Sequence, residues 1–150
     1  MSADAPIAVA RTELCPEFNQ FLIGTGDVLG AAVELACQSD ANPAHAVIGD
    51  NAVLFRLGAG IHKLDVSVEV WLDRPRTSPD EFFDSLETTI TAVDVQLYLV
   101  STTPSPRDLT VSLPTEGKLT LQAFVLDRRQ QEDAEFGIEV SASRWLIRVW

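Results

Sequence analysis

The chain has 150 residues, 46% of them hydrophobic, and a formal net charge of −11. This length suits one domain that buries roughly two-thirds of the surface its unfolded chain would expose. The apolar content excludes a disordered acidic tail, which would lack the core needed to offset chain entropy. The charge repels nucleic acid and attracts basic proteins. The composition therefore indicates a folded acidic domain with no direct nucleic-acid role.

Positive charges are missing from two long segments. Residues 12–55 and 77–106 contain no Lys or Arg, yet they hold eleven of the 22 acidic residues. These segments make up about half of the chain, so the acids are not concentrated in them; the bases are excluded from them. A folded domain of this kind is expected to present uncompensated negative surface to a partner. The alternative is that the charge serves solubility alone.

Targeting and redox features are sparse. Residues 1–11 lack a charged-then-apolar signal pattern, and no run of about 18 apolar residues is present, which predicts a cytoplasmic protein outside the membrane. Cys15 and Cys37 are the only thiols, and in a cytosolic chain they favour two buried thiols over a disulfide. Two Cys and two distant His are too few for a metal site, so no metal or cofactor is predicted.

The N-terminal third gives weak patterns. Residues 1–12 have no period and are predicted to be loose, and the first strand is expected at 17–23. Residues 28–37 fit both a helical stripe and an alternating strand, with a slight preference for strand. The turn residues of 38–51 predict a loop, and 52–57 reads as a short apolar strand.

The clearest strand of the chain is 62–73. Alternate residues from Leu64 to Leu72 are apolar and are expected to face the core. The other set faces outward and includes Asp65, Glu69, Trp71 and Asp73. Proline residues in 74–79 end the strand, after which a short helical turn is the one helix that the sequence suggests.

The C-terminal half continues with short strands. Residues 109–113 and 119–125 alternate around a Pro-Thr-Glu-Gly turn, which predicts a hairpin. The remaining predicted strands are 85–93, 95–101, 137–140 and 145–150, with a polar loop at 128–135. About eight or nine short strands with at most one short helix predict an all-β, single-domain antiparallel β-sandwich over residues 1–150.

Enzyme signatures are weak. Gly24-Thr25-Gly26 is not followed by the rest of a dinucleotide fingerprint, and no Walker lysine is present. His45 and His62 have no oriented nucleophile or acid at a useful spacing. The sequence therefore predicts a protein that is not an enzyme, with no catalytic residues.

A partner-binding face is the preferred interpretation of the outward acids. Trp71 projects from the polar side of its strand, and tryptophan is enriched among interface anchors. The alternative is that Trp71 covers the sheet beneath a loop, with Phe82 and Phe83 over it. The carboxylates would steer and pair with basic groups. The candidate residues are Asp65, Glu69, Trp71, Asp73, Asp80, Glu81, Asp84 and Glu87.

Five segments carry a resemblance to a known family: residues 18–23, 52–57, 60–70, 109–121 with its Pro114…Gly117 turn, and the closing Trp145-Leu146-Ile147-Arg148-Val149-Trp150. In this order they resemble the DNA-entry nuclease inhibitor (competence protein J) family and its uncharacterised acidic relatives in actinobacteria. The likeness covers about two-thirds of the chain and excludes residues 24–50 and 127–143. It implies a small acidic β-sandwich that binds a protein; the competence member inhibits a nuclease. No functional residues are transferred.

The resulting hypothesis is a non-enzymatic acidic binding domain of inhibitor or immunity type that masks a basic partner, such as a nuclease or toxin. One alternative is a β-sandwich that binds a small ligand or sugar in a pocket. Another is a structural or assembly subunit. A homo-oligomer would then form through an exposed strand edge, for which the C-terminal strand ending at Trp150 is the first candidate.

Overall fold

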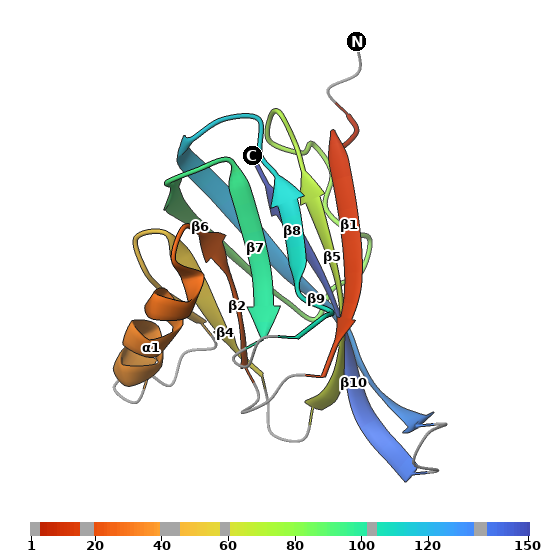
Figure 1. Ribbon diagram of the computed structural model, residues 1–150. Coiled ribbons are helices and arrows are strands. Elements are labelled where there is room, and N and C mark those ends of the chain that lie inside the picture. The colour runs from red at the N-terminus through yellow and green to blue at the C-terminus, as the bar shows by residue number, and fades with distance from the viewer. Residues whose placement is uncertain (1–3, 16–19, 40–45, 58–60, 102–104, 134–137) are drawn as a thin grey trace.

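The computed structural model describes residues 4–15, 20–39, 46–57, 61–101, 105–133 and 138–150. In these ranges the chain forms ten strands and one helix (Figure 1). In chain order they are β1 (Ala8–Leu14), β2 (Gln20–Thr25), α1 (Val28–Ser39), β3 (Ala46–Ile48), β4 (Ala52–Arg56), β5 (Ile61–Val70), β6 (Asp84–Ala92), β7 (Gln96–Ser101), β8 (Leu109–Ser112), β9 (Gly117–Asp133) and β10 (Ile138–Val149).

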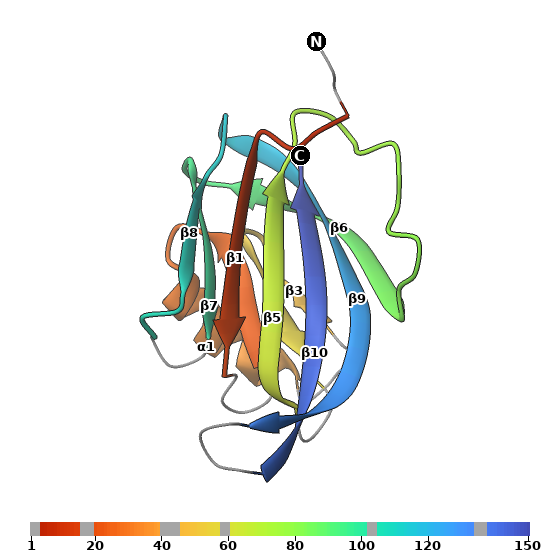
Figure 2. The same ribbon diagram turned by 90° about the vertical axis from the view of Figure 1, so that its right-hand side faces the viewer.

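The strands form two five-stranded sheets packed face to face. The first, called the long sheet, has the order β1-β5-β10-β9-β6, and the second, called the short sheet, has the order β3-β4-β2-β7-β8. Every pairing is antiparallel except that of β5 with β10, which is parallel. The predicted all-β sandwich is confirmed. The far ends of β9 and β10 extend beyond the body of the sandwich in both views (Figures 1 and 2).

The core lies between the sheets and follows the alternation read from the sequence. Leu64, Val66, Val68 and Val70 of β5 are all buried, as predicted. Leu72, expected to continue this row, is 62% exposed, because β5 ends at Val70 and the chain turns away. A strand pattern shows which residues share a face only as far as the strand itself continues.

Three aromatic rings occupy the centre of the core. Phe21 of β2 stacks on Phe55 of β4 with ring centroids 5.1 Å apart, and Trp145 of β10 meets them edge-on at 5.2 and 5.3 Å. The indole N–H of Trp145 donates to the Ser143 hydroxyl at 3.1 Å. The two sheets are thus joined by large apolar contacts with the one polar atom of the ring satisfied.

The predicted loose N-terminus is wrong for residues 8–12. They belong to β1, which pairs antiparallel with β5 along its whole length. Its inward residues include Ala8 and Ala10, so the hydrophobic contrast that reveals a strand is small. The predicted loop over 38–51 also contains the short strand β3, which pairs with β4.

The predicted hairpin of 109–113 with 119–125 is wrong as well. β8 pairs with β7 in the short sheet, whereas β9 pairs with β6 and β10 in the long sheet. Gly117, with φ +104°, therefore lies where the chain passes from one sheet to the other. Residues 128–133, predicted as a polar loop, continue β9.

The ambiguous segment 28–37 is helical, so the preference for strand was wrong. The carboxylate of Asp27 accepts the backbone N–H of Gly30 at 2.9 Å and caps α1. Val28 and Leu35 of α1 pack on Leu22 and Leu54 from the outer face of the short sheet. In Figure 1 the helix covers this sheet on the side away from the core. No helical turn follows residue 78; the described chain there is irregular.

The thiol of Cys15 is free and exposed, in contrast to the expected buried thiol. The side chain of Cys37 lies outside the described residues. His45 and the His62 side chain lie outside them too.

Gly24 offers a test of the short sheet's packing. A Cβ there would lie 2.5 Å from both the Cβ of Ala52 and the carbonyl oxygen of Asn51. Since Asn51 and Ala52 cannot move without disturbing β4, Gly24→Ala should lower the free energy of unfolding by about 1–3 kcal/mol in urea denaturation. Ser112→Ala, at an exposed position in the same sheet, is the control and should stay within about 0.5 kcal/mol. Equal results for the two variants would contradict the packing described.

Candidate functional site

A long connection crosses the outer face of the long sheet. β5 and β6 follow one another in the chain, but β10 and β9 lie between them in the sheet. Residues 71–83, called here the crossing loop, span this distance (Figure 2). Its two ends are bonded to the strands beneath: Trp71 N–H donates to the carbonyl of Val149 at 2.8 Å, and Phe83 N–H to that of Val125 at 2.6 Å.

Arg148 of β10 fastens the middle of the crossing loop to the sheet. Only 8% of the residue is exposed. Its Nε donates to the Glu69 carboxylate at 3.0 Å, and its guanidinium also donates to the carbonyl oxygen of Thr77 at 2.5 Å. The guanidinium lies over the ring of Trp71, 5.5 Å from the centroid, and 5.7 Å from that of Phe124. A nearly buried cation is thus compensated by one carboxylate, one carbonyl and two ring faces.

Trp71 does not act as an exposed anchor. It lies on the polar side of the sheet, as predicted, but it is only 6% exposed. Its indole N–H donates to the Glu69 carboxylate at 3.1 Å. Phe82, from the far end of the crossing loop, packs edge-on against Phe124 at 5.2 Å. The burial of the ring fits the covering role weighed for Trp71, and its contact with a partner stays a prediction.

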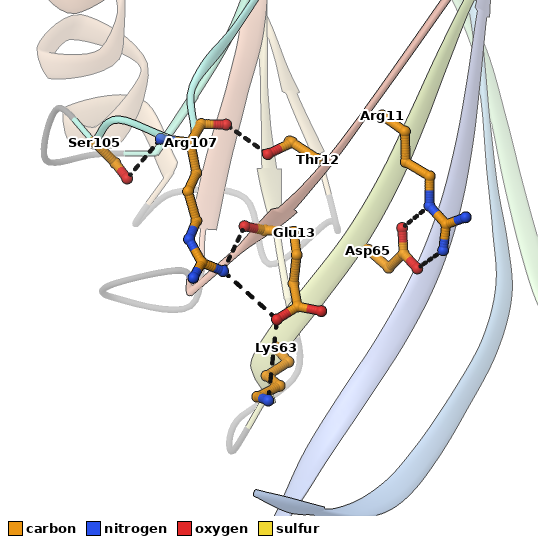
Figure 3. Close-up of polar contacts among 7 residues, drawn as sticks. All are labelled: Arg11, Thr12, Glu13, Lys63, Asp65, Ser105 and Arg107. Carbon is orange, nitrogen blue, oxygen red and sulfur yellow. Dashed lines mark hydrogen bonds and ion pairs between the residues drawn. The ribbon is translucent and has the colours of Figure 1, made fainter. Parts of the chain in front are cut away.

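Three of the predicted acids already have basic partners. Asp65 is held by both nitrogens of the Arg11 fork, with Nε 2.8 Å from Oδ1 (Figure 3). Glu69 pairs with Arg148, as described above. Glu87 pairs with Arg74 of the crossing loop at 2.7 Å.

Four of the predicted acids are exposed: Asp73, Asp80, Glu81 and Asp84, called here the acidic patch. No side chain in the described ranges forms an ion pair with any of them. Large apolar side chains lie among them, with Leu72 62%, Phe82 46% and Phe83 67% exposed. This combination of unneutralised charge and exposed apolar surface differs from a merely solvated loop.

Basic side chains gather instead at the opposite edge of the long sheet. Arg107 comes from the β7–β8 connection. Its guanidinium lies 3.6 Å from the side-chain carboxylate of Glu13 in β1 and donates to the backbone carbonyl oxygen of Glu13 at 3.4 Å (Figure 3). Lys63 of β5 approaches the same carboxylate at 4.0 Å. Thr12 donates its hydroxyl to the carbonyl of Arg107 at 2.7 Å. These contacts close the two sheets over one another at β1.

A shallow, open groove lies beside α1, with a volume of about 280 Å³. Its lining is mostly apolar, and its two acids are already bonded: Asp27 caps α1, and Asp108 accepts the backbone N–H groups of Ser101 and Ser105. Within the described ranges no three His, Cys, Asp or Glu side chains gather as a metal site, and no helix has the length and hydropathy to span a bilayer.

The acidic patch could be expected from sequence. The contacts of Arg148 with Glu69 and Thr77, called here the Arg148 clamp, could not. Arg148 stands in an apolar closing strand, where it reads as one exposed position of an alternating pattern. Its only signal is that Glu69 and Arg148 occupy the outward rows of two patterned strands; the register that places them opposite one another comes from the parallel pairing of β5 with β10.

Comparison with known proteins places the fold. No protein-family model matches the chain, and no match was found among curated proteins. Solved structures of the same fold include ComJ, inhibitor of the DNA degrading activity of NucA, from Bacillus subtilis, with a TM-score of 0.62 and 14% identity over 93% of both chains. They also include the crocagin biosynthetic gene J protein, with a TM-score of 0.60 and 15% identity over 96% of this chain and 98% of that one.

The chain is thus an all-β sandwich of the architecture seen in ComJ, and the resemblance expected from its strand segments is confirmed in the fold. The structural likeness covers 93% of this chain, whereas the resemblance read from the sequence covered about two-thirds of it. At this identity it establishes the fold and leaves the site residues to be judged from their own geometry.

The Arg148 clamp can be tested by stability. Arg148→Met keeps roughly the length of the side chain. It leaves the Thr77 carbonyl without its donor and the part-buried Glu69 carboxylate with the Trp71 indole N–H but no positive charge, so it should lower the free energy of unfolding by roughly 2–4 kcal/mol. Arg144→Met, which removes the more exposed pair with Asp127 on the same strand, is the matched control and should cost under about 1 kcal/mol. Urea denaturation measures both; similar losses would show that Arg148 fastens nothing.

The pair of Arg74 with Glu87 predicts a pH effect. The hydrogen bond from the Arg74 guanidinium, assisted by its charge, holds the pKa of the Glu87 carboxyl below its usual value despite partial desolvation. Its stabilising contribution is present above the unfolded pKa of about 4.3 and is lost as the pH falls through the lower folded value. A carbon-detected NMR titration should show this low pKa, and Arg74→Gln should raise it. An unchanged titration of Glu87 in the variant would contradict the pairing.

Proposed function

We propose that this protein is a non-enzymatic binding protein of inhibitor type, whose acidic patch masks a basic partner protein such as a nuclease or toxin. The observation that carries the proposal is the acidic patch, on the crossing loop and at the start of β6. None of its exposed carboxylates forms an ion pair with a described residue, and exposed Phe82 and Phe83 lie beside them. The two bases of the crossing loop, Arg74 and Arg76, lie against Glu87 and Asp4. Other bases pair with acids on the strand faces and at the β1 edge.

Charge and shape act together in this proposal. The negative patch raises the rate at which a basic protein meets the loop, because association is steered by the field of exposed charges. The apolar rings then add buried contact area, which charge alone does not provide. A cleft that attracts polyanions would receive the same carboxylates by the same electrostatics.

The shared fold supports the proposal in kind. ComJ, which has this fold, is an inhibitor of the DNA degrading activity of NucA. The second protein of the same fold belongs to crocagin biosynthesis. Because one fold can serve unrelated functions, the inhibitor role rests on the patch together with the likeness to ComJ, and the partner must be found by experiment.

The first experiment is capture of a partner from native host extract at low salt, with elution by a salt gradient and identification by mass spectrometry. The captured protein is then purified, and its association rate is measured with the triple variant Asp80→Asn, Glu81→Gln and Asp84→Asn. Asn at 84 keeps an acceptor for the Ser85 N–H, so the fold should persist. We expect association about tenfold slower at low salt, with the difference narrowing as salt rises.

The matched control is Glu34→Gln, Asp50→Asn and Glu116→Gln, which removes the same charge from exposed positions outside the crossing loop. If both triple variants slow association equally, net charge rather than the patch directs binding. If neither does, the patch is not the binding surface.

A further inference from the structure

Two stretches of strand edge stand out in the part of the molecule that the structure describes: the far end of β9 beyond Val125, which β6 does not reach, and the first half of β6, which adjoins the acidic patch. The sheets end at β1, β6, β3 and β8. The edges of β1 and β8 lie beside one another under the contacts of Arg107 shown in Figure 3, and β3 has only three residues. The C-terminal end of β6 is covered too, since Thr91 N–H donates to the carbonyl of Asp50 at 2.7 Å and its own carbonyl accepts the Thr25 hydroxyl at 3.3 Å. The first half of β6 remains.

The direction of the backbone there follows from the ladder. In β9, Thr120 exchanges both backbone hydrogen bonds with Trp150, at 2.8 and 3.0 Å, so the backbone N–H and C=O groups of Thr120 point toward β10. Its neighbour Leu121 therefore faces β6, where it pairs with Thr88. Glu87 and Thr89, on either side of Thr88, must point their N–H and C=O groups away from β9. Thr91 points the same way, as its bonds to the short sheet show.

These outward groups have no other use within the described chain. No described residue bonds the outward N–H of Glu87 or Thr89. At the start of the strand, the Asp84 carboxylate accepts the N–H of Ser85 at 2.8 Å, so the open edge begins after that residue. Open edges pair readily with another extended chain.

The charge beside the edge selects what can pair with it. Asp84 lies at the start of the strand and Glu81 just before it, both exposed and outside any ion pair of the described residues. A second copy of this chain would bring a second acidic patch near the first, and like charges repel. A segment carrying Lys or Arg would instead meet opposite charge. The inward row, with Leu86 partly buried, favours apolar residues at alternate positions of that segment.

We propose that the partner docks by adding an extended segment, alternating basic and apolar, to the long sheet as a further strand along Leu86–Thr89 of β6. The backbone groups of Glu87 and Thr89 set its register, and Asp84 with Glu81 binds its basic side chains. This deepens the proposed function, on which it rests for the basic character of the partner, by naming the chemistry and the site of recognition.

The edge is tested with a synthetic peptide, acetyl-Lys-Val-Lys-Val-Lys-Val-Lys-amide, titrated into the full-length protein and followed by NMR. Binding should slow hydrogen exchange at the amides of Glu87 and Thr89 and leave that of Thr88, already bonded to β9, unchanged. The control peptide has the same sequence with a methyl group on every backbone nitrogen; it keeps the charge and the side chains but lacks the backbone N–H groups that an added strand needs. It should bind at least about tenfold more weakly, since it cannot make the backbone bonds.

A variant tests the same edge from the protein side. Thr89→Pro removes an outward N–H that the fold does not use, and proline is tolerated at such edge positions. Thr89→Val, which keeps the N–H and loses only the hydroxyl, is its control. The proline variant should bind the Lys-Val peptide about tenfold more weakly, whereas the valine variant should bind it normally.

The outcomes separate the two proposals. Equal binding of both peptides, without protection at Glu87 and Thr89, overturns the edge and leaves the acidic patch as a surface that binds by charge alone. If the captured partner is slowed by the patch variant but unaffected by Thr89→Pro, the edge proposal fails and the proposed function stands. Were no basic partner captured while the peptide still protected the two amides, the edge would stand and the inhibitor role would fail. The exchange measurement on the unmodified protein keeps the test valid if the proline variant does not fold.

Discussion

The connection between β5 and β6 constrains much of what this surface can be. These strands are consecutive in the chain, but the parallel strand β10 and its partner β9 separate them in the sheet, so residues 71–83 must cross the sheet's outer face. A crossing chain brings polar backbone groups over a sheet and needs a fixed path. Arg148 provides one by donating to Thr77 while it is itself compensated by Glu69. The position of the acidic patch, the burial of Trp71 and the open half of β6 all follow from this crossing.

Acids on the strand faces and acids at the acidic patch differ in whether a basic side chain pairs with them. On the strand faces, acids are matched by arginines, as Asp65 is by Arg11 and Asp127 by Arg144. Residues 77–106 contain no base, and Asp80, Glu81 and Asp84 have no ion-pair partner among the described residues. Matched surface pairs add little to stability and nothing to the long-range field. The unmatched acids on the loop therefore contribute to the field that an approaching protein meets, and the exclusion of Lys and Arg from 77–106 concerns the outside of the molecule more than its fold.

Predictions from the sequence were correct where all residues on one face of a strand are buried in the same apolar core. The alternation in β5 identified its buried row because both neighbours in the sheet and the facing sheet present apolar side chains to it. Predictions were wrong where the structure depends on which strands pair, because alternation alone does not identify the partner strand. Residues 109–113 and 119–125 alternate well and are joined by a turn, yet they enter different sheets. Alternation determines which face is buried but carries no information on which strand lies alongside.

The remaining errors have local causes. The apolar residues of α1 fit a helical stripe and an alternating strand alike. The signal not used was Asp27, whose carboxylate accepts the Gly30 N–H and whose carbonyl accepts that of Ala31. β1 was missed because its inward residues are alanines. Trp71 lies on the predicted face of the sheet but is buried rather than exposed. Its burial depends on Arg148, which fastens the crossing loop from a position more than seventy residues away. The acids of the patch were identified because exposed charge depends least on tertiary contacts.

The clamp also bears on how a shared fold relates to a particular role. A sandwich of this kind requires little more than alternating apolar strands, which explains how it persists at 14% identity with ComJ. Arg148 and Trp71 lie outside the cluster between the sheets, and burying a cation there is a poor way to stabilise a sheet compared with apolar packing. Their arrangement is explained if the conformation of the crossing loop itself matters. A loop held in one conformation loses less entropy on binding, so under the proposed function the residues beneath the patch would contribute to recognition without touching the partner.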